Sequence, residues 1–520
     1  MKYCIYIFII LFALHAQGQT KVSSKLLSKE LKVANLFFET EDYLKAIDAY
    51  RKVLTIDITN ETANLNSAIC RIKLYQSPDS SLLHLTRISS SKIPEVQFYF
   101  GKTNHLKNNF DQAISYYNNY KSIPLKRRSI TDEEINYHIA CSNNAKQLTS
   151  LPHRSIIKNV GSNINSVYAE YVPLITPDES VMYFTSRREG STGNLKDAYG
   201  NFYEDVYVSQ KTEDGKWGTP KNLGTPINTN THDACVALSF DGNQMMIYRT
   251  SNDLLTGDLY LTRTDYSGWT NPLKLGTEIN TPFIETSACF STDTSVIYFS
   301  SNKPGGLGGK DIYRIKKLPN GRWSMPMNVG PIINTDKDED SPFLHPDGTT
   351  LYFSSKGHNT MGEYDVFKSN LNPDNFTFSA PENLGYPVNT VNNDIFFVLN
   401  ANGTHGYYSS VKEETYGGSD IYMIDTRFGD NDLKVKQGKV LFGSEINKAK
   451  ITLIDIESKQ VSGIYNASSK TGKFIMVMNP VKSYKAIVEE DGFQTIIIDI
   501  EPIASEIVEQ ELILNLTKKP

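Results

Sequence analysis

The sequence predicts a multidomain α plus all-β protein, in which N-terminal helical repeats precede a five-bladed β-propeller and a C-terminal β-sandwich. Three observations lead to this fold class. A fixed frame of polar residues recurs five times in the middle of the chain, apolar residues follow a helical period before it, and they alternate as in strands after it. A chain of 520 residues has room for several such cores.

The central frame consists of an Asn, an acidic residue five positions later, and an Asp or Asn eight positions after that. The frames begin at Asn165, Asn228, Asn280, Asn334 and Asn389. Their acidic residues are Glu170, Asp233, Glu285, Glu339 and Asp394, and their turn residues are Asp178, Asp241, Asp293, Asp347 and Asn402. A spacing that is kept while the intervening residues change indicates one repeated structural unit.

The remainder of each unit has the pattern of short strands. A short apolar and aromatic run that ends in Ser, such as "VIYFSS" at 296–301, follows four of the five turn residues. A glycine-rich turn then leads to an Asp followed by an apolar and an aromatic residue. These signature residues are Asp205, Asp258, Asp311, Asp365 and Asp420, spaced 53, 53, 54 and 55 positions apart. Four short strands in roughly 50 residues are typical of a propeller blade.

The fifth unit has no outer strand of its own after Tyr422. Residues 155–165, "SIIKNVGSNIN", match "GTPKNLGTPIN" of an earlier unit, although no blade precedes them. We therefore predict that residues 154–161 supply the outer strand of the last blade and close a ring over residues 154–426, which leaves no free sheet edge between first and last blade.

Residues 1–18 have the pattern of a secretory signal peptide. Lys2 precedes an apolar stretch from about Ile5 to Leu14, and Ala16-Gln17-Gly18 follows as a small-x-small cleavage pattern. The stretch is too short to span a bilayer, and we expect no transmembrane segment in the mature chain.

Residues 21–150 have a helical period. The segments 42–57 and 109–123 share the order aromatic residue, two residues, Ala-Ile, two residues, Tyr. Ala46 and Ala113 are 67 residues apart, which is close to two 34-residue periods. This pattern resembles the tetratricopeptide repeat family, and residues 133–147 fit a helix that caps the stack. The resemblance implies a groove that binds protein segments, whereas the alternative is a spacer that packs only on the propeller.

Residues 434–517 alternate apolar and polar side chains, with turns every eight to ten residues, and predict a small β-sandwich. The segments "GKV" at 438–440, "AKITL" at 449–453 and "TGKF" at 471–474, with Tyr484 ahead of Gly492-Phe493, resemble the carboxypeptidase-regulatory-like fold.

Composition gives no case for a nucleic-acid partner, since the formal charge of −5 is nearly neutral and no basic block stands out beyond Lys126-Arg127-Arg128. Four cysteines lie beyond the signal segment: Cys70, Cys141, Cys235 and Cys289. An oxidising compartment permits a disulfide between Cys235 and Cys289, but their unequal offsets from the turn Asp favour buried free thiols.

The five acidic residues of the frame have two interpretations. Repetition would place them in a ring near one mouth of the central channel, where oxygen ligands suit a hard cation or a basic partner. Alternatively, each carboxylate accepts backbone N–H groups within its own blade. Because a requirement of folding appears in every blade and a binding site breaks symmetry more often, we favour the structural interpretation and expect no metal and no cofactor.

Catalytic motifs do not stand out. The sequence has no nucleophile elbow G-x-S-x-G in a strand-to-helix setting and no H-E-x-x-H, and the glycine-rich segment 305–311 sits between strands rather than before a helix. The single histidines His232, His345, His358 and His405 fall in different blades. We expect a non-enzymatic protein. The alternatives are a glycan- or peptide-binding propeller and a hydrolase whose site is assembled across blades.

The order of the parts is similar to that of Bacteroidetes envelope proteins of the OmpA family, in particular the PorE-type component of type IX secretion. The resemblance implies an exported protein of the periplasm, associated with the outer membrane, that mediates contacts with other envelope proteins in secretion or gliding machinery. Those proteins end in an OmpA-like domain, whereas this sequence stops at Pro520 after the sandwich. Peptidoglycan binding is therefore not expected.

Overall fold

The computed structural model describes residues 24–89, 93–153, 155–197, 199–266, 268–372, 375–426, 434–443, 445–446, 449–459, 461–468, 471–479, 482–502 and 511–519. The expected signal peptide at 1–18 and residue 154 lie outside the described residues. The chain divides into two compact units that meet between Gln147 and Leu148, and each is described by itself.

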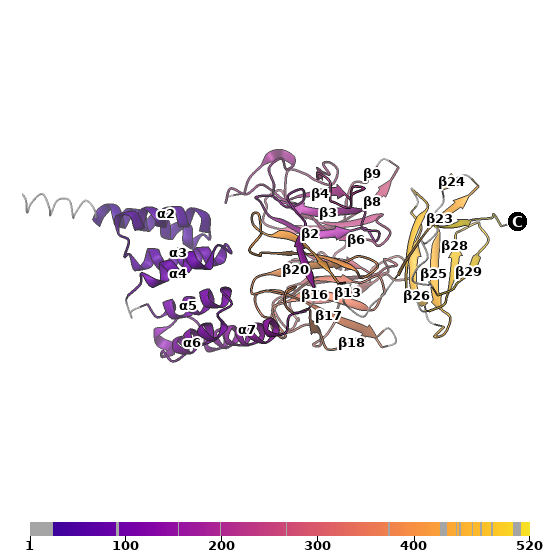
Figure 1. Ribbon diagram of the computed structural model, residues 1–520. Helices are drawn as coiled ribbons and strands as arrows, with labels where there is room; N and C mark the ends of the chain where they lie inside the picture. The colour runs from indigo at the N-terminus through magenta and orange to yellow at the C-terminus, as the bar shows by residue number, and fades with distance from the viewer. Residues whose placement is uncertain are drawn as a thin grey trace, which may run out of the picture. The chain divides into compact units, whose positions relative to one another are not determined.

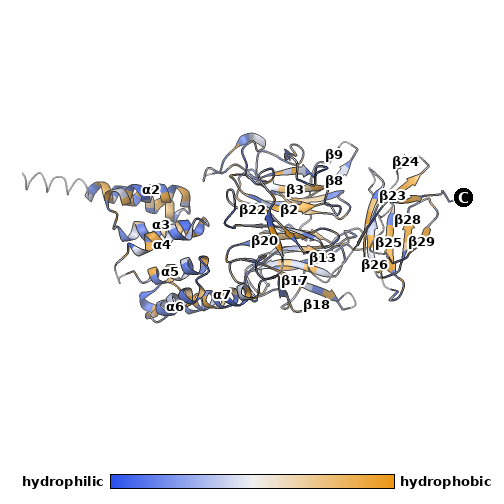
Figure 2. Cartoon of the chain, in the orientation of Figure 1, coloured by the Kyte–Doolittle hydropathy of each residue, from blue (hydrophilic) through white to orange (hydrophobic). Residues whose placement is uncertain are grey.

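The first unit is helical. A helix over residues 24–39 is followed by helices α2 to α7 (Figure 1). From α2 to α6, each helix packs against the next one along the chain. These helices are α2 (Tyr43–Ile56), α3 (Glu61–Lys73), α4 (Pro78–Thr86), α5 (Glu95–Leu106), α6 (Phe110–Lys121) and α7 (Asp132–Ser150), with a 3-10 turn at Leu125–Arg127 before α7. Figure 2 shows hydrophobic and hydrophilic residues along each helix, as amphipathic packing requires.

Local sequence explains where these helices begin. The Asp42 carboxylate accepts the Lys45 N–H at 3.2 Å, and the Asn60 side chain accepts the Ala63 N–H at 3.0 Å, so both residues cap free N–H groups. Pro78 begins α4, where its missing N–H costs nothing. Ala46 and Tyr50 on α2 are fully buried, as are Ala113 and, to within 1%, Tyr117 on α6.

Five antiparallel sheets follow in the second unit, each ordered along the chain from its first strand outward. The first three are β2 (Glu170–Ile175), β3 (Val181–Ser186), β4 (Asp205–Gln210) and β5 (Lys221–Asn222); β6 (Asp233–Leu238), β7 (Gln244–Thr250), β8 (Gly257–Asp265) and β10 (Leu273–Lys274); and β11 (Ala288–Phe290), β12 (Val296–Ser301), β13 (Asp311–Lys316) and β14 (Met327–Asn328). In the second sheet, β9 (Gly268–Trp269) also pairs with β8.

The fourth and fifth sheets continue this pattern. They are β15 (Glu339–Leu344), β16 (Thr350–Ser355), β17 (Asp365–Asn372) and β19 (Glu382–Asn383), with β18 (Thr377–Phe378) beside β17; and β20 (Asp394–Leu399), β21 (His405–Ser410), β22 (Asp420–Asp425) and β1 (Ile156–Asn159). The outer strand of the fifth sheet thus comes from the start of the unit: Ile156 is paired with Asp425 and Asn159 with Tyr422.

The first strands of the five sheets contact one another in sequence order, and β20 contacts β2. The sheets therefore follow one another around a common centre in a propeller-like arrangement. Apolar clusters lie between neighbouring sheets; for example, Met246 and Leu259 of the second sheet pack against Ile297 and Phe299 of the third. Burial of such side chains contributes about 1.5–3 kcal/mol each.

The last part of the unit is a pair of sheets. One contains β24 (Glu445–Ile446), β23 (Lys434–Phe442) and β27 (Lys473–Met478), with β30 (Leu512–Asn515) parallel to β23. The other contains β26 (Val461–Asn466), β25 (Lys450–Asp455), β28 (Tyr484–Glu489) and β29 (Ile496–Ile500). Residues of both sheets, including Ile451 and Phe474, share one buried core. At this level the expected multidomain order of helices followed by sheets is confirmed.

Within the described residues, no helix combines the length and the hydrophobicity that crossing a membrane requires.

Candidate functional site

The five acidic residues of the frame stand at or near the start of the first strands and are at least 96% buried. Each carboxylate accepts the backbone N–H of the residue after the frame Asn, at 2.6 to 3.1 Å. It also accepts the hydroxyl of that same residue. The donors are Ser166, Thr229, Thr281, Thr335 and Thr390. This is the local hydrogen bonding expected of a structural carboxylate.

A second partner comes from the end of the second strand of the same sheet. Ser186, Ser301, Ser355 and Ser410 donate their hydroxyls to these carboxylates at 2.5 to 2.7 Å. In the second sheet, Arg249 takes the place of the serine and lies 2.5 Å from Asp233. Burial raises the pKa of Glu339 to about 7 and also raises the pKa of Asp233 and Asp394. No three acidic, His or Cys residues of the described chain are grouped to hold a metal ion.

The frame Asn joins each unit to the sheet before it. The Asn334 side chain accepts the Ile312 N–H at 2.8 Å and donates to the Ile312 carbonyl at 2.9 Å, as another strand would. It also donates to Asn328 Oδ1 at 2.8 Å. Asn165 makes the same pair of bonds to Ile421, both at 2.9 Å, and so links the first frame to the fifth sheet.

The signature Asp residues belong to the same network. Asp311 accepts the Asn328 side chain at 2.6 Å and the N–H groups of Leu307 and Gly308 at 2.6 and 3.0 Å. The glycine-rich loop 305–311 therefore wraps the carboxylate of Asp311. Corresponding bonds to an Asn side chain are made by Asp205, Asp365 and Asp420.

Asp258 departs from this pattern. Its sheet has Lys274 where the others have the Asn, and the two side chains form an ion pair at 2.7 Å. The Lys274 and Asp258 side chains are 55% and 27% exposed. A solvent-accessible ion pair thus replaces an amide that is buried or partly buried in the other four sheets.

The histidines are held in local pairs. His345 Nδ1 lies 3.1 Å from Asp347, and His358 Nε2 lies 2.9 Å from the Ile333 carbonyl. His405 Nδ1 lies 2.9 Å from Glu179, which also contacts Lys211 at 2.7 Å. Burial by itself would raise the pKa of Glu179, but hydrogen bonds from His405, Lys211 and Tyr407 outweigh it and lower that pKa to about 2. This cluster joins the first and fifth sheets.

His232 belongs to a second, partly buried cluster. Its Nδ1 lies 3.0 Å from Glu204 Oε2, and the Tyr171 hydroxyl donates to Glu204. Burial by itself would raise the pKa of Glu204, but the bonds from His232 and Tyr171 and the charge of Arg187 outweigh it and lower that pKa.

The four described cysteines are buried and free. Burial raises the pKa of Cys70, Cys235 and Cys289 to about 12, which leaves these thiols unreactive.

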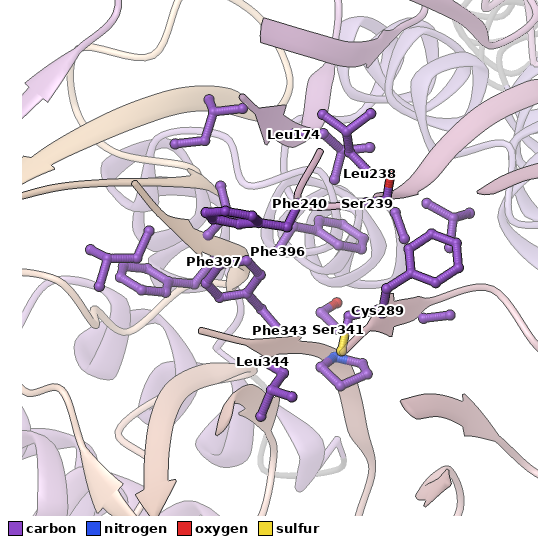
Figure 3. A pocket seen from close by; sticks show the side chains of 18 of the residues that line it. Leu174, Leu238, Ser239, Phe240, Cys289, Ser341, Phe343, Leu344, Phe396 and Phe397 are labelled. Carbon is purple, nitrogen blue, oxygen red and sulfur yellow. The ribbon is translucent and has the colours of Figure 1, made fainter. Parts of the chain in front are cut away.

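A central cavity of about 80 Å³ is lined by residues from the first strands of all five sheets (Figure 3). Its wall is mostly apolar and contains the phenylalanines Phe240, Phe290, Phe343, Phe396 and Phe397. It contains neither a histidine nor a charged side chain among the described residues that line it. An aromatic-lined cavity suits a small ligand better than acid–base chemistry.

Ser341 is a polar residue of the cavity wall with a strained backbone. Its φ of 52° is left-handed, and a break in the β15–β16 register lies between Asp340 and Phe343. The Ser341 N–H donates to Asp340 Oδ1 at 2.7 Å and to Ser287 Oγ at 3.0 Å. Lys310 Nζ lies 2.8 Å from Asp340 Oδ2. This mostly buried ion pair fixes the Asp340 carboxylate, which in turn accepts the Ser341 N–H.

The same position is strained in two other sheets. Val172 and Phe396, each two residues after the frame acid as Ser341 is, have φ values of 52° and 61°. For a β-branched or bulky residue this conformation is a genuine outlier, and such strain gathers at functional sites. The sequence reasoning missed this position. The signal available was its variation, because the five frames carry Val172, Cys235, Ser287, Ser341 and Phe396 there.

No family model matches the chain, and no curated protein matches it. Among solved structures, an α-L-arabinofuranosidase from Lactobacillus brevis is 13% identical, with 50% of this chain and 90% of that one covered and a TM-score of 0.33. A protein of unknown function from Dyadobacter fermentans is 13% identical, with 49% and 76% covered and a TM-score of 0.34. A B. megaterium levansucrase variant is 10% identical, with 54% and 90% covered and a TM-score of 0.33. Similarities this low carry no argument about function.

Proposed function

We propose that residues 154–426 form a closed five-bladed β-propeller and that the helical unit is a stack of the tetratricopeptide type. The contact of β20 with β2 and the bonds between Asn165 and Ile421 support closure of the ring. The equivalent burial of Ala46 with Tyr50 and of Ala113 with Tyr117 supports a helical repeat, because small and large residues alternate at such interfaces.

We propose further that the protein is a non-catalytic scaffold that binds other proteins of the cell envelope. The observation that carries this proposal is the hydrogen bonding of the five frame acids. Each is committed to its own sheet, so none is left to bind a metal ion or to exchange protons with a substrate. No described histidine lines the central cavity, which also disfavours a hydrolase.

An apolar stripe on the first helix favours a protein partner. Leu26, Val33 and Leu36 are 46%, 39% and 58% exposed, and their spacing of seven and three residues places them on one face. Leu31 and Ala34 of the same helix pack on the opposite side, in the helical core. A helix with a second apolar face turned to solvent is typical of an interaction surface.

The proposed scaffold acts in the periplasm, next to the outer membrane, in type IX secretion or gliding. Both the compartment and the process are inferred from the resemblance of domain order. Deletion of the gene tests the process: reduced release of secreted cargo is expected, and unchanged release would remove this role.

Crosslinking in intact cells followed by mass spectrometry tests the scaffold. We expect crosslinks from residues 24–150 to envelope proteins, and we expect Leu36→Asp to reduce them several-fold. Leu125→Asp is the matched control, because Leu125 is 60% exposed but lies outside the stripe. Equal crosslinking by both variants would contradict the proposed surface, provided that both keep the circular dichroism of the parent.

A further inference from the structure

The lining of the central cavity fits an uncharged molecule. A charged ligand would lose its hydration in a wall whose described residues include no Lys, Arg, His, Asp or Glu, and so would meet no compensating charge. A sugar, which has a hydroxyl on nearly every carbon, would meet too few polar partners for the same reason.

The size of the cavity limits the ligand further. A closed apolar cavity that binds benzene has a volume of about 150 Å³, so a cavity of about 80 Å³ encloses only about half of such a ring. Because the cavity is partly open, a single aromatic ring with one substituent can enter with one end, and the surrounding phenylalanines Phe343, Phe396 and Phe397 supply edges and faces for it (Figure 3).

The hydroxyls of the wall are already bonded, with one exception. Ser239 donates to Asp241, Ser291 to Asp293 and Ser287 to Asp340. Thr286 accepts from Lys310, and Thr292 donates to the Pro346 carbonyl. Ser341 is 94% buried, yet its Oγ has no hydrogen-bond partner among the described residues. Its side chain points into the cavity (Figure 3).

The surroundings of Ser341 indicate that its position is maintained rather than accidental. The Lys310–Asp340 ion pair and the Ser287 hydroxyl fix its backbone in a conformation that glycine would adopt without strain. Burial of a hydroxyl without a hydrogen-bond partner costs free energy, and a bound ligand that supplies the missing hydrogen bond removes this cost.

We infer that the cavity binds one small uncharged molecule, whose apolar body has the size of an aromatic ring and whose single hydroxyl or carbonyl group bonds to Ser341. Ser341 is the residue that determines specificity for the polar group, and the phenylalanines bind the body. This site is independent of the proposed scaffold surface, which lies on the first helix.

Calorimetric titration of the full chain with phenol and with toluene tests the inference. The two probes have seven non-hydrogen atoms each and differ by the hydroxyl. We expect phenol to bind with one-to-one stoichiometry and about tenfold more tightly than toluene, and Ser341→Ala to weaken phenol about tenfold without changing toluene. Benzoate, which carries a charge, is expected not to bind.

Ser354→Ala is the matched control, because Ser354 is also a buried hydroxyl without a partner in the described structure but does not line the cavity. It should bind phenol as the parent does. Ala237→Val, which adds two carbons to the wall, should weaken both probes. Phenol binding that Ser341→Ala leaves unchanged would overturn the inference, and so would the failure of both probes to bind the parent, which is the result expected of a cavity that holds water alone.

Discussion

The frame acids and the residues two positions after them lie on the same strands but have opposite character. Each acid is buried with several hydrogen-bond donors, and its surroundings repeat in five sheets. The second position carries four different residue types in the five sheets, is left-handed in three of them, and includes a buried hydroxyl with no partner in the described chain. Repeated residues therefore mark what the fold needs, and departures from the repeat mark where function can reside.

This difference has a physical basis. Equivalent positions in a repeat meet equivalent backbone, so a shared folding requirement selects the same chemistry in each unit. The left-handed bulge recurs at Val172 and Phe396 and so belongs to the repeated fold, whereas the unmet hydrogen bond at Ser341 brings no benefit to the fold.

The largest effect is expected from removal of a frame Asn. Asn334→Ala leaves the Ile312 N–H unpaired in a buried place, removes one of the two donors to the Ile312 carbonyl, and removes a partner of Asn328. We expect a loss of about 3–5 kcal/mol in the free energy of unfolding, because unmet buried polar groups cost more than a lost bond. Denaturant unfolding followed by tryptophan fluorescence measures it. Asn320→Ala, in an exposed turn, is the control, and equal stability of the two variants would contradict the role of the frame.

The ionisation of Glu339 is expected to change the free energy of unfolding with pH by up to about 3 kcal/mol. Burial raises its pKa from 4.5 to about 7, so the folded protein holds this proton more tightly than the unfolded chain does. The resulting contribution to stability is fully present below about pH 4.5 and is lost as the pH rises through about 7.

Glu339→Gln should remove that part of the pH dependence, since an amide can bond to Thr335 and Ser355 without titrating. Unfolding curves at pH 5 and pH 8 measure the difference between parent and variant. Glu382→Gln, at a mostly exposed side chain, should retain the parental slope. A parental slope in Glu339→Gln would show that the carboxyl is ionised throughout.

A gain in stability of about 1–2 kcal/mol is expected from Ser341→Gly. Glycine relieves the left-handed strain and removes the unmet hydroxyl, and these gains exceed the extra entropy of glycine in the unfolded chain. Ser341→Ala, which removes only the hydroxyl, should fall between parent and glycine variant. Thermal unfolding measures all three, and a glycine variant less stable than the parent would contradict the assignment of strain.

The sequence predicts more of the fold than of the candidate site. Residues 155–165 match the segment around Asn222 position by position, and this is why the sequence predicts an outer strand at residues 154–161, where the structure has β1. The cavity was out of reach, because it depends on φ at Ser341 and on side chains that converge from five sheets. Spacing identifies equivalent positions, but it does not report backbone strain or which hydroxyl lacks a partner.

The smallest effect is expected where the repeat itself departs from its pattern. Lys274→Ala removes an ion pair with Asp258 whose partners are accessible to water, and such pairs contribute about 0.2–1 kcal/mol. Asn328→Ala, at the equivalent position of the next sheet, removes one hydrogen-bond partner from each of the buried residues Asp311 and Asn334 and should cost about 2–3 kcal/mol. Added salt should weaken the Lys274 contribution and leave that of Asn328 unchanged, because only the exposed pair is screened. Matched unfolding curves of the two variants at low and high salt measure both differences. Equal losses would mean that the ion pair replaces the buried amide in full, and the second sheet would then follow the same rule as the other four.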